Sequence, residues 1–381
     1  WATSGLPPSI GLGFRSTFRN PGRLLMTVLG LGLSLIIVSG MMMVTEGMLG
    51  WMNEANDAET WDMQVGLMNP IDNQELRIWT QENSASYEAE WALQVPINAS
   101  GDNRMMLLNA IEGFSEDGVE SMHASRLVEG SLPTSGAPMP EVVIDMGVNK
   151  FLEWNVGDVV EVRYGTHVFE FKIVGVVDEM QRSVWVHHDD LLDGTGVIGE
   201  NAHNVLYLRN IGDADIVNDV SLRQIEGITS TIDKQSQEEM LDESLEMNKE
   251  ILDSFIFFGA LIAIAVLINT LMINITEHDT EFATLRTLGA SSSRLVTIML
   301  FEHLVIGLIG GVVGAVASIA AAEALGASFS NWAFMIRFPV QWDIAIMTAI
   351  GVMVASVAVV PFGIFRVRGM DLVEKTKEFS H

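Results

Sequence analysis

The sequence contains no cysteine, which excludes disulfide bridges, thiolate catalysis and zinc–thiolate sites. It also lacks a GxxxxGK[ST] phosphate loop, the GxSxG and HExxH motifs, a Ser-His-Asp order and a paired-carboxylate motif. We therefore predict that the chain is not an enzyme, that it has no catalytic residues and no cofactor of its own, and that it does not hydrolyse ATP by itself.

Charge is nearly absent from four long apolar runs, although the chain carries 49 acidic residues. The runs are 24–44, 255–275, 295–322 and 344–365, and only the third contains ionisable residues, Glu302 and His303. Each run has about the ~20 residues that a helix needs to cross a bilayer. One such run could be a buried core helix, but four predict transmembrane helices. The first run is too long for a usual signal-peptide core, and no small-residue cleavage site follows it.

Basic residues near the ends of these runs predict the orientation in the membrane. Arg15, Arg19 and Arg23 precede the first run, whereas the loop between the third and fourth runs contains only Arg337. Basic residues also lie between the second and third runs and after the fourth: Arg286, Arg294, Arg366, Arg368, Lys375 and Lys377. We predict a multi-pass plasma-membrane protein with cytoplasmic termini, a cytoplasmic segment 276–295 and a large extracytoplasmic domain.

The predicted outer segment, 50–250, is strongly acidic. It contains 38 of the 49 acidic residues and 11 of the 21 basic ones, so its net charge is −27 of the total −28. Such a surface repels nucleic acid and anionic lipid headgroups. We therefore predict no nucleic-acid partner, and a well-solvated extracytoplasmic surface explains the charge better than adaptation to a saline habitat.

Alternating or clustered β-branched residues predict strands in this segment at 141–145, 159–165, 167–177 and 204–210. Apolar spacing predicts a helix within 213–225 and a long helix from Gln235 that continues into the second span, with Met240, Leu241, Leu245, Ile251 and Leu252 on one side. The fold class is therefore a membrane α-helical protein of four transmembrane helices with an inserted extracytoplasmic α/β (α+β) domain. Trp51 fits an interfacial anchor, and Trp61, Trp79 and Trp91 are predicted to be core residues.

The run His187-His188-Asp189-Asp190 is the one cluster with metal-ligand chemistry. On a strand, consecutive side chains point to opposite faces, so at most two of the four could share an ion. Because Asp189 and Asp190 precede LLDGTGV, we predict that an acidic residue caps a short helix there, and we predict no metal site.

The third span carries two pairs of glycines spaced four residues apart, Gly307/Gly311 and Gly310/Gly314. Such pairs let helices approach closely, so we predict helix packing within or between subunits. Glu302 is either a functional intramembrane group, or a side chain that reaches the cytoplasmic interface or pairs with a neighbouring basic residue. In the second span, Asn269 and Asn274 are predicted to hydrogen-bond across helices, and Pro361 is predicted to kink the fourth span or mark its last turns.

A charged segment separates the second and third spans, TEHDTEFATLRTLGASSSRL (276–295). Its apolar positions have helical spacing, Gly289 suits a C′ cap, and Ala290 begins the turn into the third span. One face of the predicted helix consists of Glu281, Phe282, Leu285 and Leu288, and Arg286 lies beside this face. Spacing alone leaves two alternatives open, a helix lying on the membrane surface and a helix that fits a groove on a soluble partner.

The order of one span, a large outer domain and three spans resembles the FtsX/MacB-type ABC transporter permease family. The stretch NTLMINITEHDTEFATLRTLGASSSRLVTIMLFEHLVIGLIGGVVG (269–314) resembles the most recognisable part of that family. The residues that match in place are Glu281, Leu285, Arg286, Leu288, Gly289, Ala290, Glu302, Gly307, Gly311 and Gly314. The stretches 13–35, 130–162 and 366–377 are similar to the family's lead into the first span, its periplasmic core domain and its closing segment.

The resemblance implies that 276–295 contains a coupling helix that docks on a separate ATP-binding subunit, with Glu281, Phe282, Leu285, Arg286, Leu288, Gly289 and Ala290 at the contact. It also implies a permease that moves its outer domain to export or extract a lipid-like, lipoprotein or peptide cargo. The alternatives are a mechanical relay that activates an extracytoplasmic hydrolase, and a membrane-anchored sensor or adhesion protein without an ATPase partner. Four spans make half a transporter, so a second copy, a homologous subunit or the other half of a longer chain is expected. The start at Trp1 instead of Met favours the last.

The predicted domain limits follow from these assignments. They are 1–23 for a cytoplasmic N-terminal segment, 24–50 for the first transmembrane helix, 51–234 for a MacB-like core domain, 235–254 for a stalk helix, 255–365 for an FtsX-like permease domain and 366–381 for a cytoplasmic tail.

Overall fold

The structure is a computed structural model. It describes residues 8–71, 73–118, 121–179, 181–195, 202–277, 281, 284–285, 287–333, 335 and 340–368. The chain forms two compact units: a membrane unit of Trp1–Gly47, Met247–Ala327 and Phe338–His381, and an outer unit of Met48–Glu246 and Ser328–Arg337.

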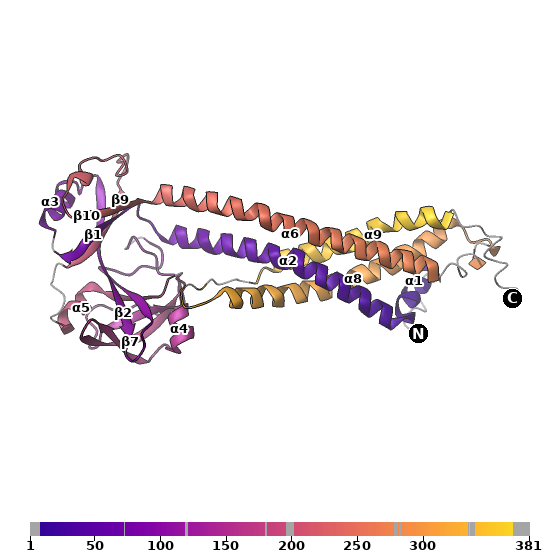
Figure 1. The fold of residues 1–381 in the computed structure, drawn as a ribbon, viewed down its shortest axis with the longest axis horizontal. Coiled ribbons are helices and arrows are strands. Elements are labelled where there is room, and N and C mark those ends of the chain that lie inside the picture. The colour runs from indigo at the N-terminus through magenta and orange to yellow at the C-terminus, as the bar shows by residue number, and fades with distance from the viewer. Residues whose placement is uncertain are drawn as a thin grey trace. The chain divides into compact units, whose positions relative to one another are not determined.

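The helices are α1 (Pro8–Arg19), α2 (Pro21–Ala58), α3 (Gln74–Glu82), α4 (Met146–Leu152), α5 (His188–Thr195), α6 (Lys234–Glu277), α8 (Ser292–Phe329) and α9 (Trp342–Arg368). The strands are β1 (Met63–Ile71), β2 (Tyr87–Ala99), β3 (Met105–Ile111), β4 (Leu127–Gly130), β5 (Glu141–Asp145), β6 (Val159–Tyr164), β7 (His167–Val177), β8 (Ser183–His187), β9 (His203–Asn210) and β10 (Ile228–Asp233). Figure 1 labels most of these elements.

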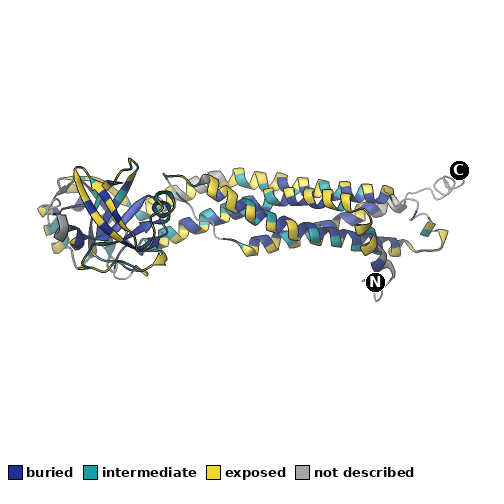
Figure 2. Ribbon diagram, turned by 90° about the horizontal axis from the view of Figure 1, so that it is seen from below, coloured by how far each residue is buried: buried dark blue, intermediate teal, exposed yellow. Residues whose placement is uncertain are grey.

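Four helices in the described part of the chain, α2, α6, α8 and α9, are long and apolar enough to cross a membrane. They pack around buried aliphatic side chains that include Leu31, Leu267, Leu271, Met299 and Val360. Exposed apolar side chains cover their outer faces, seen as yellow segments along the helices in Figure 2. Apolar residues on the outside suit contact with lipid. The helix predicted from Gln235 into the second span is present as the 44-residue α6, and Pro361 lies within α9.

The described strands of the outer unit form one ten-stranded sheet in the order β10-β1-β9-β2-β3-β8-β5-β7-β4. The β3–β8 and β5–β7 pairs are parallel, and the other pairs are antiparallel. The remaining strand, β6, pairs with both β2 and β7. It therefore closes β2, β3, β8, β5, β7 and β6 into a ring.

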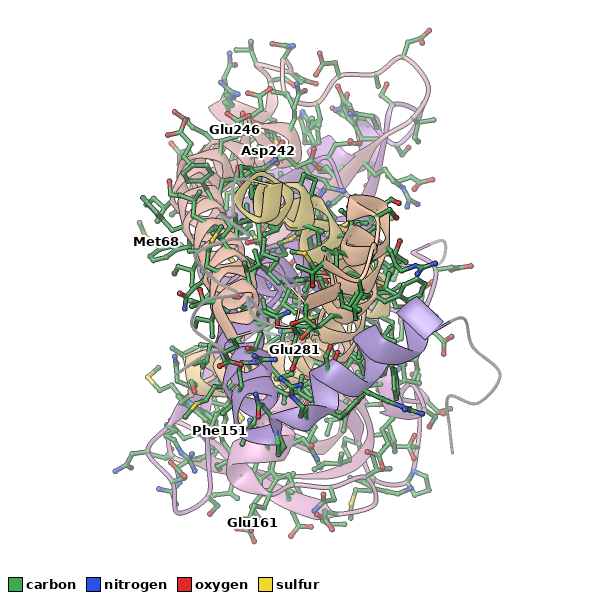
Figure 3. All side chains as sticks on the ribbon, turned by 90° about the vertical axis from the view of Figure 1, so that its right-hand side faces the viewer. Met68, Phe151, Glu161, Asp242, Glu246 and Glu281 are labelled. Carbon is green, nitrogen blue, oxygen red and sulfur yellow. The ribbon has the colours of Figure 1, made fainter. Side chains whose placement is uncertain are left out.

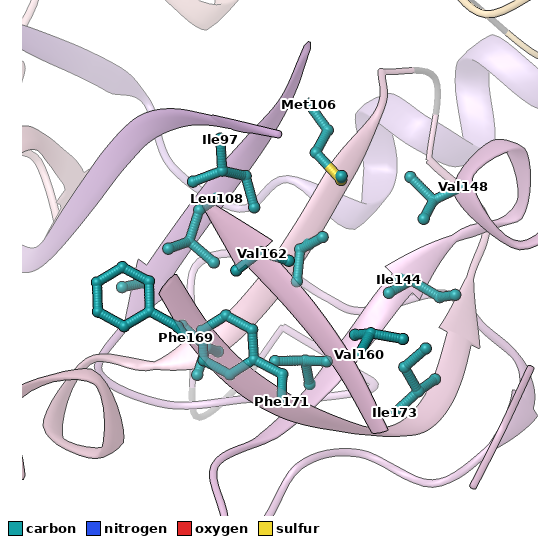
Figure 4. Close-up of a cluster of buried hydrophobic side chains, with 14 of the residues drawn as sticks. Ile97, Met106, Leu108, Ile144, Val148, Val160, Val162, Phe169, Phe171 and Ile173 are labelled. Carbon is teal, nitrogen blue, oxygen red and sulfur yellow. The ribbon is translucent and has the colours of Figure 1, made fainter. Parts of the chain in front are cut away.

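Side chains from this ring fill its interior. Phe171, Ile97, Leu108 and Ile144 are each at most 1% exposed, and Figure 4 shows them converging with their neighbours. A second core packs α3 against β1, β2 and β9, with Leu76, Trp79 and Leu206 buried. Burial of so much apolar surface is the main stabilising term for a domain that has no disulfide.

A buried ion pair fixes the junction between β5 and α4. The Asp145 carboxylate caps α4 by accepting the Gly147 and Val148 N–H groups at 2.6 and 3.3 Å, and its Oδ1 lies 3.0 Å from Arg182 Nη1. A Cβ on Gly147 would overlap the Arg182 guanidinium, so only glycine fits there. Burial raises the pKa of Asp145 to about 6, although Arg182 and the Ser183 N–H oppose the shift.

The strands predicted at 141–145 and 167–177 coincide with β5 and β7, and those at 159–165 and 204–210 match β6 and β9 within a residue. The helix predicted within 213–225 is wrong, because only Leu222–Gln224 forms a short 3₁₀ helix. Asp215 Oδ1 accepts the backbone N–H groups of Val217 and Asn218. Such local side-chain bonds compete with a helix for the backbone donors.

One other prediction is corrected. Trp51 is not an exposed interfacial anchor: it is 4% exposed, and its Nε1 donates to Asp178 Oδ1 at 2.9 Å. On the apolar side predicted for early α6, Met240 is 71% and Ile251 58% exposed. Trp61, Trp79 and Trp91 are core residues, as predicted.

Residues Ser328–Arg337, between the third and fourth apolar helices, belong to the outer unit. Trp332 Nε1 donates to the Met105 carbonyl at 3.1 Å, and the Arg104 guanidinium lies 4.6 Å from the Trp332 ring centre. Phe151 packs edge-on against the same ring. This short connection is therefore held by specific contacts to β3 and α4.

Candidate functional site

The segment between α6 and α8 ends in a capped turn. Its described residues 281, 284, 285 and 287 are helical, and Gly289 has φ of +89°, a conformation that favours glycine. The Ala290 N–H donates to the Leu285 carbonyl at 2.9 Å, and the Leu288 N–H donates to the Thr284 carbonyl at 3.0 Å. The first bond is the six-to-one bond of a Schellman cap, with Gly289 at C′. The turn therefore has a defined geometry.

The two apolar residues around this cap have different environments. Leu285 is half-buried and packs against the core of the membrane unit, whereas the Leu288 residue is 80% exposed. Phe282 and Arg286, which the sequence also places in this site, lie outside the described residues. The cap thus leaves one large apolar side chain, Leu288, exposed.

Basic residues from α1 and α2 contact acidic residues around the segment. Arg19 Nη1 lies 2.6 Å from Glu281 Oε1, and Figure 3 labels Glu281. Arg23 forms an ion pair with Glu277 at the end of α6, which also accepts a hydrogen bond from Asn20 Nδ2 at 3.3 Å. These contacts attach the segment to the N-terminal helices. Sequence reasoning used the arginines only for orientation and did not predict these partners.

Arg23 also reaches the acidic residue within the third apolar helix. Its Nη2 lies 3.4 Å from Glu302 Oε1, and the Glu302 side chain is 1% exposed. Pairing with a neighbouring basic residue was one of the alternatives for Glu302, and this contact matches it. A buried carboxylate needs such a partner, because an unpaired charge in an apolar interior is costly.

The two asparagines of α6 that were predicted to hydrogen-bond across helices, Asn269 and Asn274, lie in different environments. Asn269 is exposed on α6, and the buried Asn274 Oδ1 accepts no hydrogen bond from any described residue. The predicted cross-helix hydrogen bond through Asn274 Oδ1 is therefore absent from the described part of the chain. His303 is fully buried on α8.

The four glycines of α8 face two different helices. A Cβ on Gly310 would lie 2.7 Å from Leu31 Cδ1, and one on Gly314 would overlap Leu35, so this pair faces α2. A Cβ on Gly311 would lie 2.9 Å from the Ala349 carbonyl oxygen of α9. Gly307 faces α9 at Ser356 in the same way. Each pair spaced four residues apart thus provides a smooth groove for one neighbouring helix.

The His187–Asp190 run spans the junction of β8 and α5. His187 Nε2 lies 3.2 Å from the Pro133 carbonyl, and the His188 ring stacks on His203 with 4.3 Å between ring centres. Asp190 Oδ1 accepts the Gly136 N–H at 2.7 Å, so this carboxylate binds a neighbouring loop and not the start of its own helix. Burial lowers the pKa of His188. Among the described residues no group of three or more His, Asp or Glu side chains could hold a metal ion.

Sequence reasoning missed an acidic–basic triad in the outer unit. His123 Nδ1 lies 2.6 Å from Glu59 Oε1, His123 Nε2 lies 3.1 Å from Glu179 Oε1, and the ring stacks on Trp185. Burial opposes protonation, but the two carboxylates outweigh it and raise the pKa of His123 to about 10. The three residues are 64 and 56 positions apart, so no local pattern could reveal them.

Comparison with known families decides the identity of the chain. The family of MacB-like periplasmic core domains matches residues 24–228, and the family of FtsX-like permease C-terminal domains matches residues 254–372. The chain belongs to the FtsX/MacB-type ABC transporter permease family. The resemblance inferred from the sequence is therefore confirmed.

Individual relatives of this permease are distant. An uncharacterised ABC transporter permease of Methanocaldococcus jannaschii is 25% identical over 189 residues, which are 44% of this chain and 47% of the relative. The match thus spans about half the length of that relative. The periplasmic region of MacB from Actinobacillus actinomycetemcomitans has a TM-score of 0.35 at 12% identity and covers 51% of this chain and 98% of its own. The extracellular domain of YknZ from Gram-positive bacteria has a TM-score of 0.29 at 15% identity and covers 39% and 84%.

Proposed function

We propose that this ABC permease couples ATP hydrolysis in a separate ATP-binding subunit to movement of its outer unit, and that the segment 276–295 docks on that subunit. The exposed Leu288 carries the proposal. An apolar side chain that is 80% exposed at a capped turn is suited to insert into a groove on another protein.

The ion pairs of Arg19 and Arg23 support the same role. A docking segment transmits force only if it is attached to the membrane unit by more than its two chain connections. Arg19–Glu281 and Arg23–Glu277 provide that attachment, and Arg23 extends it to Glu302 on α8. The contact between Arg19 and Glu281 is half-exposed, so its own contribution to stability is small and salt-dependent. The role of the Arg19–Glu281 pair is to orient the segment.

The cytoplasm is the proposed side for this segment and for both termini, with the outer unit extracytoplasmic, because the basic residues cluster at the ends assigned there. A second permease subunit, either another copy or a homologous half, completes the transporter in this proposal. A lipid-like, lipoprotein or peptide cargo exported from or extracted out of the membrane suits a permease whose large domain lies outside it.

Co-purification with candidate ABC ATP-binding subunits tests the docking role. Leu288→Asp should abolish co-purification, because it places a charge at the centre of the proposed apolar contact, and Leu288 is 80% exposed in this chain. Leu285→Asp would be a poor test, since Leu285 packs against the core of the membrane unit and its loss would disturb the fold.

The matched control is Val220→Asp, which changes an apolar side chain that is 64% exposed on the outer unit. It should leave co-purification unchanged. If an ATP-binding subunit remains bound to the Leu288→Asp protein as tightly as to the wild type, the segment is not the docking site and the proposal is wrong.

A further inference from the structure

The outer unit contains a cavity of about 360 Å³ that the transport role does not explain. Its wall combines the last turns of α2, the first turn of α6, strands β1–β3, β8 and β9, and the loops that carry His123, Arg126 and Glu179. Its volume falls within the range of about 300–1,000 Å³ that is usual for small-molecule sites. We call it the outer cavity.

Two buried polar atoms at the wall of the outer cavity have no hydrogen-bond partner among the described residues. They are Asn109 Oδ1, an acceptor on a residue that is 2% exposed, and Arg126 Nη1, a donor. Arg126 Nη1 has only a distant ion-pair contact, with Asp178 Oδ2 at 4.0 Å. A buried polar atom without a partner destabilises the fold, so such atoms need an explanation. A ligand that offers one donor and one acceptor would satisfy both.

The charged side chains at the cavity contact one another, but together they carry one net negative charge. His123 lies between Glu59 and Glu179, and the raised pKa of His123 keeps this ring protonated at neutral pH. Arg126 is compensated by Asp178, whose backbone carbonyl also accepts a hydrogen bond from Arg126 Nη2. The excess negative charge disfavours an anionic ligand, and the unpartnered Arg126 Nη1 donor disfavours a cationic one. The cavity therefore favours an uncharged ligand.

The rest of the wall contains both aromatic rings and side-chain amides. Trp61, Trp185 and Tyr207 supply apolar surface, and Gln64 and Gln237 supply amides that each carry a donor and an acceptor. A saccharide matches this combination, since its C–H face is apolar and each hydroxyl both donates and accepts. We propose that the outer cavity binds an uncharged saccharide unit, with Asn109 Oδ1 accepting from one hydroxyl and Arg126 Nη1 donating to another.

Tryptophan fluorescence of the purified full chain tests this proposal, because Trp51, Trp61 and Trp185 all line the cavity. The protein is prepared in lipid nanodiscs without sugar-headed detergent, which would itself compete for the site. Glucose, galactose and N-acetylglucosamine are titrated separately, with N-acetyl-alanyl-alanine amide as an uncharged peptide of comparable size. We expect saturable binding of at least one of the sugars and none of the peptide.

Asn109→Leu removes the unpartnered acceptor while keeping the side-chain volume. We expect it to weaken sugar binding about tenfold or more and to leave the melting temperature of the unliganded protein unchanged or raised. Gln237→Ala, at the exposed start of α6, should also weaken binding without a loss of stability. The matched control is Asn149→Leu on α4. The Asn149 side chain donates to the Trp154 carbonyl and does not line the cavity, so this variant should leave binding unchanged.

Three results would overturn the assignment. Saturable binding of the peptide but not of the sugars would make the cavity a peptide site. An absence of binding by every probe, or sugar binding that persists unchanged in both cavity variants, would show that the cavity is not a saccharide site. Because none of these measurements involves an ATP-binding subunit, they succeed or fail independently of the proposed coupling function.

Discussion

The His123 triad should make the stability of the outer unit fall as the pH rises. His123 has an ordinary pKa of 6.5 in the unfolded chain and a pKa of about 10 in the fold. The folded state therefore keeps a proton that the unfolded state releases. The stabilisation is fully present below pH 6.5, declines above it and is lost once the pH passes about 10.

The size of the effect follows from the linkage between proton binding and folding. Between the two pKa values, stability should fall by about 1.4 kcal/mol per pH unit, or about 3 kcal/mol from about pH 7 to about pH 9. The geometry accounts for the raised pKa of His123, since each ring nitrogen lies within 3.1 Å of a carboxylate oxygen, and these two contacts outweigh burial, which lowers the pKa. His123→Gln removes the proton-binding ring and should remove most of this pH dependence.

Urea unfolding of the outer unit, followed by tryptophan fluorescence with the full chain in nanodiscs, measures the effect. The ring of His123 stacks on Trp185 at 4.1 Å between ring centres, so fluorescence reports on this site. His167→Gln, an exposed histidine on β7, is the control and should keep the wild-type slope. If wild type and His123→Gln lose stability in parallel as the pH rises, the triad does not hold a proton and the reasoning is refuted.

Two further predictions concern packing and buried charge. Gly314→Leu should lower the melting temperature of the full chain by several degrees, because the new side chain overlaps Leu35, whereas Gly351→Leu on α9, where a Cβ meets nothing within 4 Å, should change it little. Equal shifts in the two variants would contradict the assigned groove. Arg182→Met should destabilise the outer unit by about 3–5 kcal/mol in urea unfolding because Asp145 then stays buried without its partner, and adding Asp145→Asn should recover part of the loss. A double variant less stable than the single one would contradict this account.

Local patterns explain which parts of the fold the sequence predicted. The strands β5 and β7 were predicted with their limits, because β-branched residues cluster there between turn residues. The strands β2 and β8 were missed: β8 is buried throughout and β2 has no regular alternation, and both depend on neighbouring strands more than on their own sequence. The helix predicted within 213–225 is wrong, because the Asp215 side chain accepts the backbone N–H groups of Val217 and Asn218, which a helix would use.

The sequence by itself determined the four apolar helices, the glycine cap at Gly289 and the glycine pairs of α8. Each of these depends on residues within a few positions of one another, and helix geometry converts that spacing into a face or a turn. Only the tertiary structure decided which helix each glycine pair contacts, that Arg23 meets both Glu277 and Glu302, and that Glu59, His123 and Glu179 form one cluster. These contacts join residues far apart in the chain, and their energies depend on burial and distance, which no short stretch of sequence specifies.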